Sequence, residues 1–148
     1  MANTIDILGD DAVTDSIIDG SIVEFVDIQI TLIGSYAFSS CSALTSIDLP
    51  AATSIGSYAF FGCSKLTSID LPAVTSVFDS AFFGCSALTS VILRNTSQVA
   101  SLAKANAFSG ADNAIIYVPD ALVDDYKAAT NWSTYADRIK GLSELPAA

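Results

Sequence analysis

The sequence predicts a solenoid in which short repeats stack through parallel strands and share one core. One pattern is written three times in residues 33–98, and its first two copies, 33–54 and 55–76, are identical at 18 of 22 positions. The third copy keeps 10 of the 22 positions of the second. Within each copy the apolar residues follow the strand spacing L-x-x-I-x-L. A repeat this short cannot bury its own apolar face, so the copies must stack.

The composition is that of one globular domain, residues 1–148. Hydrophobic residues make up 51% of the chain and charged residues 15%, which is enough apolar surface for a sizeable core. The net charge is −10. A negative field of this strength repels phosphate backbones and anionic lipids, so we expect no nucleic-acid partner. We also expect no membrane insertion, because no segment approaches the roughly 18 consecutive apolar residues of a membrane span.

Residues 1–32 are expected to form an N-terminal cap. They begin with a short helix, N-capped by Asp10 or Asp11 and ended by Gly20, and continue with a strand within residues 21–30. Three carboxylates would share one helix face at i, i+4 spacing: Asp11, Asp15 and Asp19. The EF-hand spacing and its glycine are absent, so the pattern favours a solvated helix face over a calcium site. Whether this acidic segment binds a cation stays open.

Within the repeats, residues 33–119, each strand is expected in the LTSIDLP segment. Pro50 and Pro72 end the first two strands, because proline has no N–H to donate to the ladder. The inward-pointing positions are Leu44, Ile47 and Leu49, then Leu66, Ile69 and Leu71, then Leu88, Val91 and Leu93. In the return path, Gly34 and Gly56 are expected to allow a tight bend, and the SYAFxxC segment is expected to form a helical or 3₁₀ turn.

The Ala-Phe pairs of successive copies are expected to stack as columns in the core and to dominate its stability. The aromatic members are Phe38, Phe60 and Phe82. The pair recurs at Ala107 and Phe108, four positions later than the repeat period would place it, which indicates an insertion around residues 98–106. Residues 115–119 then form the last strand, in which Ile116 and Val118 match the inward positions of the earlier strands.

Residues 120–148 are expected to form a C-terminal helical cap and tail. Asp120 N-caps a first helix whose apolar face carries Leu122, Tyr126 and Ala129. A second short helix is capped by Ser133, with Trp132 at the corner and with Tyr135, Ala136 and Ile139 along it. Such a layer suits a lid over the exposed end of a repeat stack. Residues 142–148 are expected to be a loose tail.

The segment IGSYAFSSCSALTSIDLP resembles the BspA-like class of bacterial leucine-rich repeats, whose pattern is L-x-x-I-x-L-P, then I-G, then A-F-x-x-C. The resemblance covers residues 33–119. It implies a right-handed α/β solenoid with a short parallel sheet, and a role in surface attachment or protein recognition rather than catalysis. The segment IIYVPDALVDDYKAATNWSTYADRI is similar to the C-terminal cap of bacterial and prophage-encoded members.

The three cysteines are expected to be buried free thiols. Cys41, Cys63 and Cys85 occupy equivalent positions in the three copies and should form a column with neighbours about 4.8 Å apart. That separation suits a disulfide, but stacked side chains point the same way and the number of cysteines is odd. We therefore expect the three thiols to be buried and to pack as small hydrophobic side chains. No zinc and no other cofactor is expected, since the chain has no histidine and no C-x-x-C pair.

The outward strand positions form a candidate binding face. Its residues are Ser46, Asp48, Ser68, Asp70, Ser90, Ile92 and Tyr117. Asp48 and Asp70 should lie side by side. Two close carboxylates can carry out acid-base chemistry, or they can be an exposed pair of like charges on a solvated face. Without a cleft or a histidine we do not expect an enzyme. Parallel solenoid sheets commonly present such a face to partners.

Further aromatic residues lie beside the core pairs: Tyr36, Tyr58, Phe61, Phe78 and Phe83. They either pack between turns on the convex side or form an exposed row. An exposed row would mark a site for self-association or for a partner.

These features together predict a non-enzymatic recognition or attachment module that binds a protein or a surface glycan. The resemblance suggests that it is phage- or prophage-encoded and associated with a virion or host surface. The alternative is a structural subunit that self-assembles through its aromatic face or its solenoid ends. The N-terminus lacks the basic region and apolar run of a signal peptide, so we expect synthesis in the cytoplasm and virion association after lysis.

Overall fold

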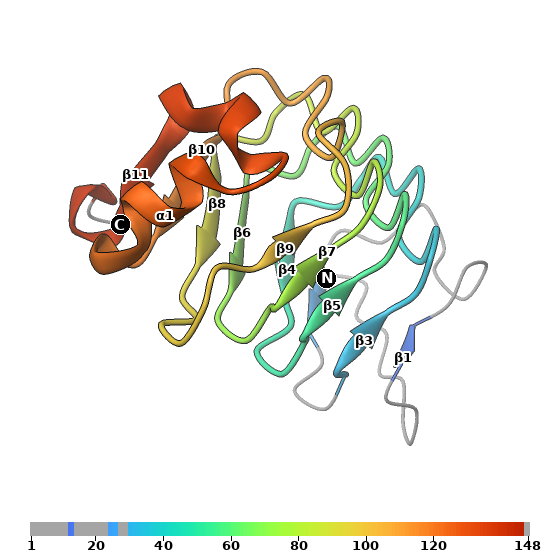
Figure 1. Ribbon diagram of the computed structural model, residues 1–148. Helices are drawn as coiled ribbons and strands as arrows, with labels where there is room; N and C mark the ends of the chain where they lie inside the picture. Colours follow the sequence, from blue (N-terminus) through green and yellow to red (C-terminus); the bar gives the residue numbers. More distant parts are fainter. Residues whose placement is uncertain (1–11, 14–23, 27–29, 147–148) are drawn as a thin grey trace.

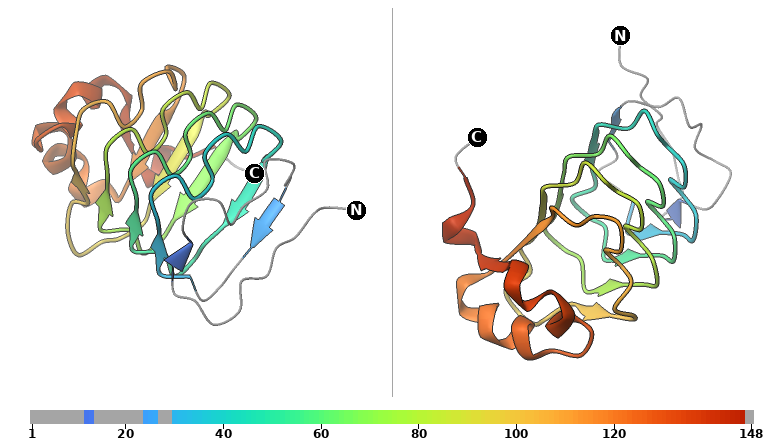
Figure 2. Two further views of the ribbon diagram at one scale, coloured as in Figure 1. Left: turned by 90° about the vertical axis from the view of Figure 1, so that its right-hand side faces the viewer. Right: turned by 90° about the horizontal axis from the view of Figure 1, so that it is seen from above.

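The computed structural model describes residues 12–13, 24–26 and 30–146, and in these residues parallel strands stack into two sheets (Figure 1). The six-stranded sheet contains, in spatial order, β2 (Glu24–Val26), β4 (Ser46–Asp48), β6 (Ser68–Leu71), β8 (Ser90–Leu93), β10 (Ile115–Val118) and β11 (Ile139–Gly141). The five-stranded sheet contains β1 (Ala12–Val13), β3 (Leu32–Ile33), β5 (Ser54–Ile55), β7 (Ser76–Val77) and β9 (Ser101–Leu102). Successive coils of the repeat lie one behind the other (Figure 2).

The strand register follows the repeat. Asp48 pairs with Asp70 and Asp70 with Ile92, one repeat period of 22 residues apart, and Ile92 pairs with Tyr117 at an offset of 25 because of the insertion. The same offset extends upstream of the three copies, because Glu24 pairs with Ser46. The predicted strands in the LTSIDLP segments and in residues 115–119 are therefore confirmed.

The structure contains a second parallel sheet that the sequence did not predict. Ile33, Ile55 and Val77 are buried in the core, and each also belongs to a two-residue strand of the five-stranded sheet. Two extended residues at equivalent places in successive coils lie one strand spacing apart, so their backbones pair. The pattern of side chains carries little sign of such short strands.

The predicted N-terminal helix is contradicted where the structure describes it. Ala12 and Val13 form β1, which pairs in parallel with β3. The rest of that helix, with Asp11, Asp15 and Asp19, lies outside the described residues.

The SYAFxxC segment is a run of turns rather than a helix. In the first copy the N–H of Ala37 donates to the carbonyl of Gly34 at 3.2 Å, and the N–H of Cys41 donates to Phe38 at 3.2 Å. Tyr36 lies inside the first of these turns and has a φ of 62°, and its equivalents Tyr58 and Ser80 have φ values of 58° and 55°. A left-handed residue at this point stops a helix from propagating.

Gly56 is required for close packing between coils, and its φ is not positive. A Cβ at this position would lie 2.7 Å from the backbone of Ile33, Gly34 and Ser35 in the preceding coil. The expected tight bend is therefore a close approach of two backbones, which only glycine permits.

The inserted residues divide between two places. Ser76 pairs with Ser101 at an offset of 25, so three of them lie before β9. The fourth lies between Leu102 and Ala107, because the N–H of Phe82 donates to the carbonyl of Ala107 at 2.8 Å.

Four phenylalanines form a continuous column through the core. The ring centroids of Phe38, Phe60, Phe82 and Phe108 are 5.2, 5.3 and 5.2 Å apart, and neighbouring planes are within 3° of parallel. All four side chains are buried. The column ends at the C-terminal cap, where the ring of Tyr135 meets Phe108 edge-on at 5.3 Å.

The three thiols form the predicted buried column and are free. The Sγ of Cys63 donates to the carbonyl of Phe38, and the Sγ of Cys85 donates to the carbonyl of Phe60, each at 3.1 Å. Burial raises the pKa of the Cys85 thiol from 9.0 to about 12. Burial raises the pKa of Cys63 further, with its two neighbouring thiols adding to the effect.

The C-terminal cap differs from the predicted pair of helices. It contains η1 (Asp120–Leu122), α1 (Val123–Ala128), η2 (Trp132–Arg138), β11 and η3 (Leu142–Glu144). Asp120 is not an N-cap: its Oδ1 accepts a hydrogen bond from the N–H of Ser143 at 3.1 Å. Ser133 lies inside η2, whose N-cap position is Asn131. Ile139 begins a sixth strand rather than continuing a helix.

Side chains of the cap occupy the hydrogen-bonding groups that the last coil would otherwise offer to a further coil. Trp132 Nε1 donates to the carbonyl of Ala100 at 2.6 Å, and Asn131 Nδ2 donates to that of Leu102 at 2.7 Å. The N–H of Ala100 donates to the hydroxyl of Tyr126 at 2.9 Å. The cap therefore closes this end of the stack. In the described part of the chain, no helix has the length and apolarity needed to span a membrane.

The central position of Phe60 in the aromatic column gives a first prediction. Phe60→Ala removes a ring that contacts both Phe38 and Phe82, and should lower the free energy of unfolding by roughly 3–5 kcal/mol because the cavity cannot collapse. Phe83→Ala is the control, since that ring is 39% exposed and should cost much less. Urea denaturation followed by circular dichroism measures both values. Equal losses for the two variants would contradict the assigned core.

The thiol column gives a second prediction, on alkaline pH. A raised native pKa means that the folded protein keeps a proton which the unfolded chain releases, so stability is full below the ordinary thiol pKa of 9.0 and falls as pH rises toward about 12. Cys63 and Cys85 should each remove about 1.4 kcal/mol of unfolding free energy per pH unit in this range. Urea titrations across this range measure the slope, and Cys85→Ala should make it shallower. An unchanged slope in that variant would refute the assignment.

Candidate binding face on the six-stranded sheet

The outward side of the six-stranded sheet carries the seven predicted site residues, and we call this side the strand face. Its members are Ser46, Asp48, Ser68, Asp70, Ser90, Ile92 and Tyr117. They alternate along each strand with the inward residues Ile47, Ile69 and Val91, which are buried. The side chains therefore lie in two rows across neighbouring strands, with the spacing set by the parallel ladder.

The first row consists of serines. Ser68 pairs in register with Ser90, and the hydroxyl of Ser90 donates to that of Ser68 at 3.1 Å. Ser46 occupies the equivalent position on β4 and is exposed. The row continues to Ile115 on β10, so its polar part ends at β8.

The second row changes from polar and exposed to apolar and buried. Asp48 is exposed and Asp70 is half-buried, whereas Ile92 is only 7% exposed and Tyr117 only 6%. The residues follow one another across the strands in the predicted order, but the last two are buried. The exposed part of the strand face therefore lies over β4 and β6. Ile92 on β8 and Tyr117 on β10 are too buried to contact a partner.

Arg94 is the residue on this face that the sequence reasoning missed. Its Nε donates to both carboxylate oxygens of Asp70, at 2.9 Å each, and both side chains are partly exposed. Arg94 stands one repeat period after Pro72, at the place where the first two copies have proline. The loss of proline just after the third strand was the available signal. Among the described residues Asp48 has no basic partner.

The strand face offers hydrogen-bond donors and acceptors but no assembled catalytic group. The hydroxyls of Ser68 and Ser90 contact each other, and Asp70 contacts Arg94. A serine nucleophile needs an adjacent base, and the chain contains no histidine. In the described ranges no group of three or more histidine, cysteine or acidic residues is placed to hold a metal ion. The arrangement suits recognition of a polar partner.

The additional aromatic residues form a surface row beside the core column. Tyr36 stacks on Tyr58 with centroids 5.0 Å apart, and Phe61 stacks on Phe83 at 5.4 Å. Tyr58 and Phe61 join the two pairs at 5.6 Å. The rings therefore pack between turns, and the end members also stay open to solvent, with Tyr36 49% exposed. Phe78 is separate from this row.

Comparison with known proteins identifies the repeats. The family model of the BspA type leucine rich repeat region matches residues 19–126 in six copies. The match begins upstream of residue 33, in agreement with the register of β2 and β4. A search of curated proteins finds no match. The predicted α/β leucine-rich-repeat solenoid is confirmed, and such repeats are typical of protein-interaction modules. The chain belongs to the BspA-type leucine-rich-repeat family.

Proposed function

We propose that this protein is a non-enzymatic recognition module that binds a protein partner through the exposed part of the strand face. The carrying observation is Asp48, an exposed carboxylate on a rigid strand that has no basic partner among the described residues. A partner that places a lysine or arginine there gains a charge-assisted hydrogen bond. Ser46 and Ser68 beside it supply additional hydroxyls.

The face is organised before a partner arrives. Its side chains project from a parallel ladder, and Arg94 already holds Asp70 through two hydrogen bonds. Little conformational freedom is then lost on binding, which favours affinity. The adjacent Asp48 and Asp70–Arg94 pair also present acceptors and a donor within one strand spacing, so the face favours a partner with a matching charge pattern.

The proposed attachment role concerns a virion or a host surface. It rests on the similarity of residues 115–139 to the cap segment of prophage-encoded members. Antibody detection in purified phage particles tests it: the protein should co-purify with the particles and resist washing with salt. Recovery only in the particle-free fraction would reject virion attachment.

The strand-face proposal predicts a selective loss of binding in Asp48→Asn. Peptides selected from a displayed random library against the native protein should be rich in lysine and arginine. Their affinity for Asp48→Asn should fall by about tenfold to a hundredfold, because a hydrogen bond to a charged group contributes roughly 1.5–3 kcal/mol. Fluorescence anisotropy of a labelled peptide measures the ratio.

The matched control is Asp124→Asn, which makes the same change in net charge on the exposed surface of α1. It should leave peptide affinity unchanged. Equal binding to all three proteins would reject the strand face as the site.

Light scattering of the native protein distinguishes this function from the alternative, self-assembly. An oligomer that forms with rising protein concentration, and that Phe83→Ser dissociates, would favour self-assembly through the surface aromatic row.

A further inference from the structure

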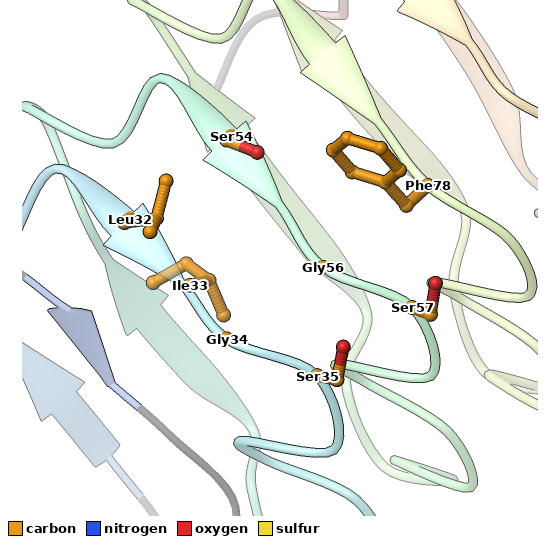
Figure 3. A pocket seen from close by; sticks show the side chains of 8 residues that line it. All are labelled: Leu32, Ile33, Gly34, Ser35, Ser54, Gly56, Ser57 and Phe78. Carbon is orange, nitrogen blue, oxygen red and sulfur yellow. The ribbon is translucent and has the colours of Figure 1, made fainter.

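A second candidate site lies on the five-stranded sheet, away from the strand face. It is an open groove with a volume of about 330 Å³. Leu32 from one coil and Phe78 from the next but one form its walls, and Ser54 and Gly56 of the coil between them form its floor (Figure 3). Both walls are exposed apolar side chains, with Leu32 47% and Phe78 43% exposed.

The groove exists because one outward position changes between copies. Gly34, Gly56 and Phe78 are equivalent residues of the three copies, so a large ring follows two glycines. The floor at Gly56 cannot be filled by a side chain, since a Cβ there would lie 2.7 Å from the preceding backbone. Beside it Ser54 is small. The slot is therefore one coil wide and is enforced by backbone packing.

The groove combines an aromatic wall with hydroxyl groups and has no charge. None of its eight lining residues is ionisable. The hydroxyls of Ser35, Ser54 and Ser57 have no hydrogen-bond partner within the described protein. Ser35 and Ser57 point the same way at one end of the slot (Figure 3). A ligand that fills this space must offer both an apolar surface to Phe78 and polar groups to the serines.

We propose that this groove binds one hexopyranose unit of a neutral glycan. A pyranose ring has an apolar C–H face, which packs on the ring of Phe78, and a rim of hydroxyls that act as both donors and acceptors toward Ser35, Ser54 and Ser57. The volume of about 330 Å³ lies at the small end of the range for ligand sites, roughly 300–1,000 Å³, which suits one sugar ring rather than a larger ligand.

Other occupants fit the groove less well. A second copy of this chain also carries a net charge of −10, so the two copies repel each other. An apolar protein side chain would cover the three serine hydroxyls without giving them hydrogen-bond partners, which costs free energy. An anionic ligand finds no positive charge in the lining and faces the negative field of the whole protein.

Saturation-transfer NMR with simple sugars tests the proposal. The probes are the methyl pyranosides of glucose, galactose, mannose and N-acetylglucosamine, each at millimolar concentration with the full-length protein. At least one should receive saturation at its ring protons. The signal should be lost in Phe78→Ala and retained in Phe83→Ala, an exposed phenylalanine outside the groove.

A second variant tests the hydroxyl contacts without removing the aromatic wall. Ser54→Ala keeps the strand and Phe78 but removes the hydroxyl without adding bulk to the groove, and should weaken sugar binding several-fold in a titration of chemical shifts. Circular dichroism establishes that each variant is folded. Absence of transfer to all four sugars, or an equal signal in Phe78→Ala, would overturn the proposal. So would a dimer in sedimentation experiments that Phe78→Ala dissociates, because it would assign the groove to a second copy.

Discussion

The whole structure depends on one constraint: each residue of a coil lies directly against its equivalent in the next coil. The repeat period and the parallel ladder impose this throughout the three copies. Where the equivalent residues are phenylalanines, the result is a column with ring centroids 5.2–5.3 Å apart, which buries a large apolar surface in register. Where they are cysteines, it is a column of buried free thiols. The same rule that builds the core also decides what the surface presents.

Like charges are the unfavourable case of that rule. Asp48 and Asp70 must lie next to each other, and an uncompensated pair of this kind destabilises a sheet. Arg94 offsets the charge of Asp70 from the end of the next strand, at a position where proline would otherwise stand. Asp48 remains as the exposed acid. The site proposed on the strand face therefore depends on a departure from the repeat, namely Arg94 in place of proline. The groove beside Phe78 also depends on such a departure, because Phe78 replaces glycine.

A stack of equivalent coils also has no natural end. In this protein, cap side chains cover the last coil. Trp132, Asn131 and Tyr126 form hydrogen bonds with backbone groups of that coil that a further coil would otherwise pair with. An unprotected edge would recruit another chain. With this end closed, the strand face and the groove on the five-stranded sheet are two surfaces along the sides of the solenoid that stay open.

The sequence by itself determined the long strands, their register, the buried columns and the row of site residues, because a repeated pattern states which residues are neighbours. Tertiary structure alone decided the features that a pattern of side chains does not encode. The five-stranded sheet depends on two extended residues per coil, and the contact between Arg94 and Asp70 joins side chains 24 residues apart in neighbouring coils. Ile92 and Tyr117 point outward as predicted yet are buried, since direction follows from strand periodicity but exposure depends on everything packed around the strand.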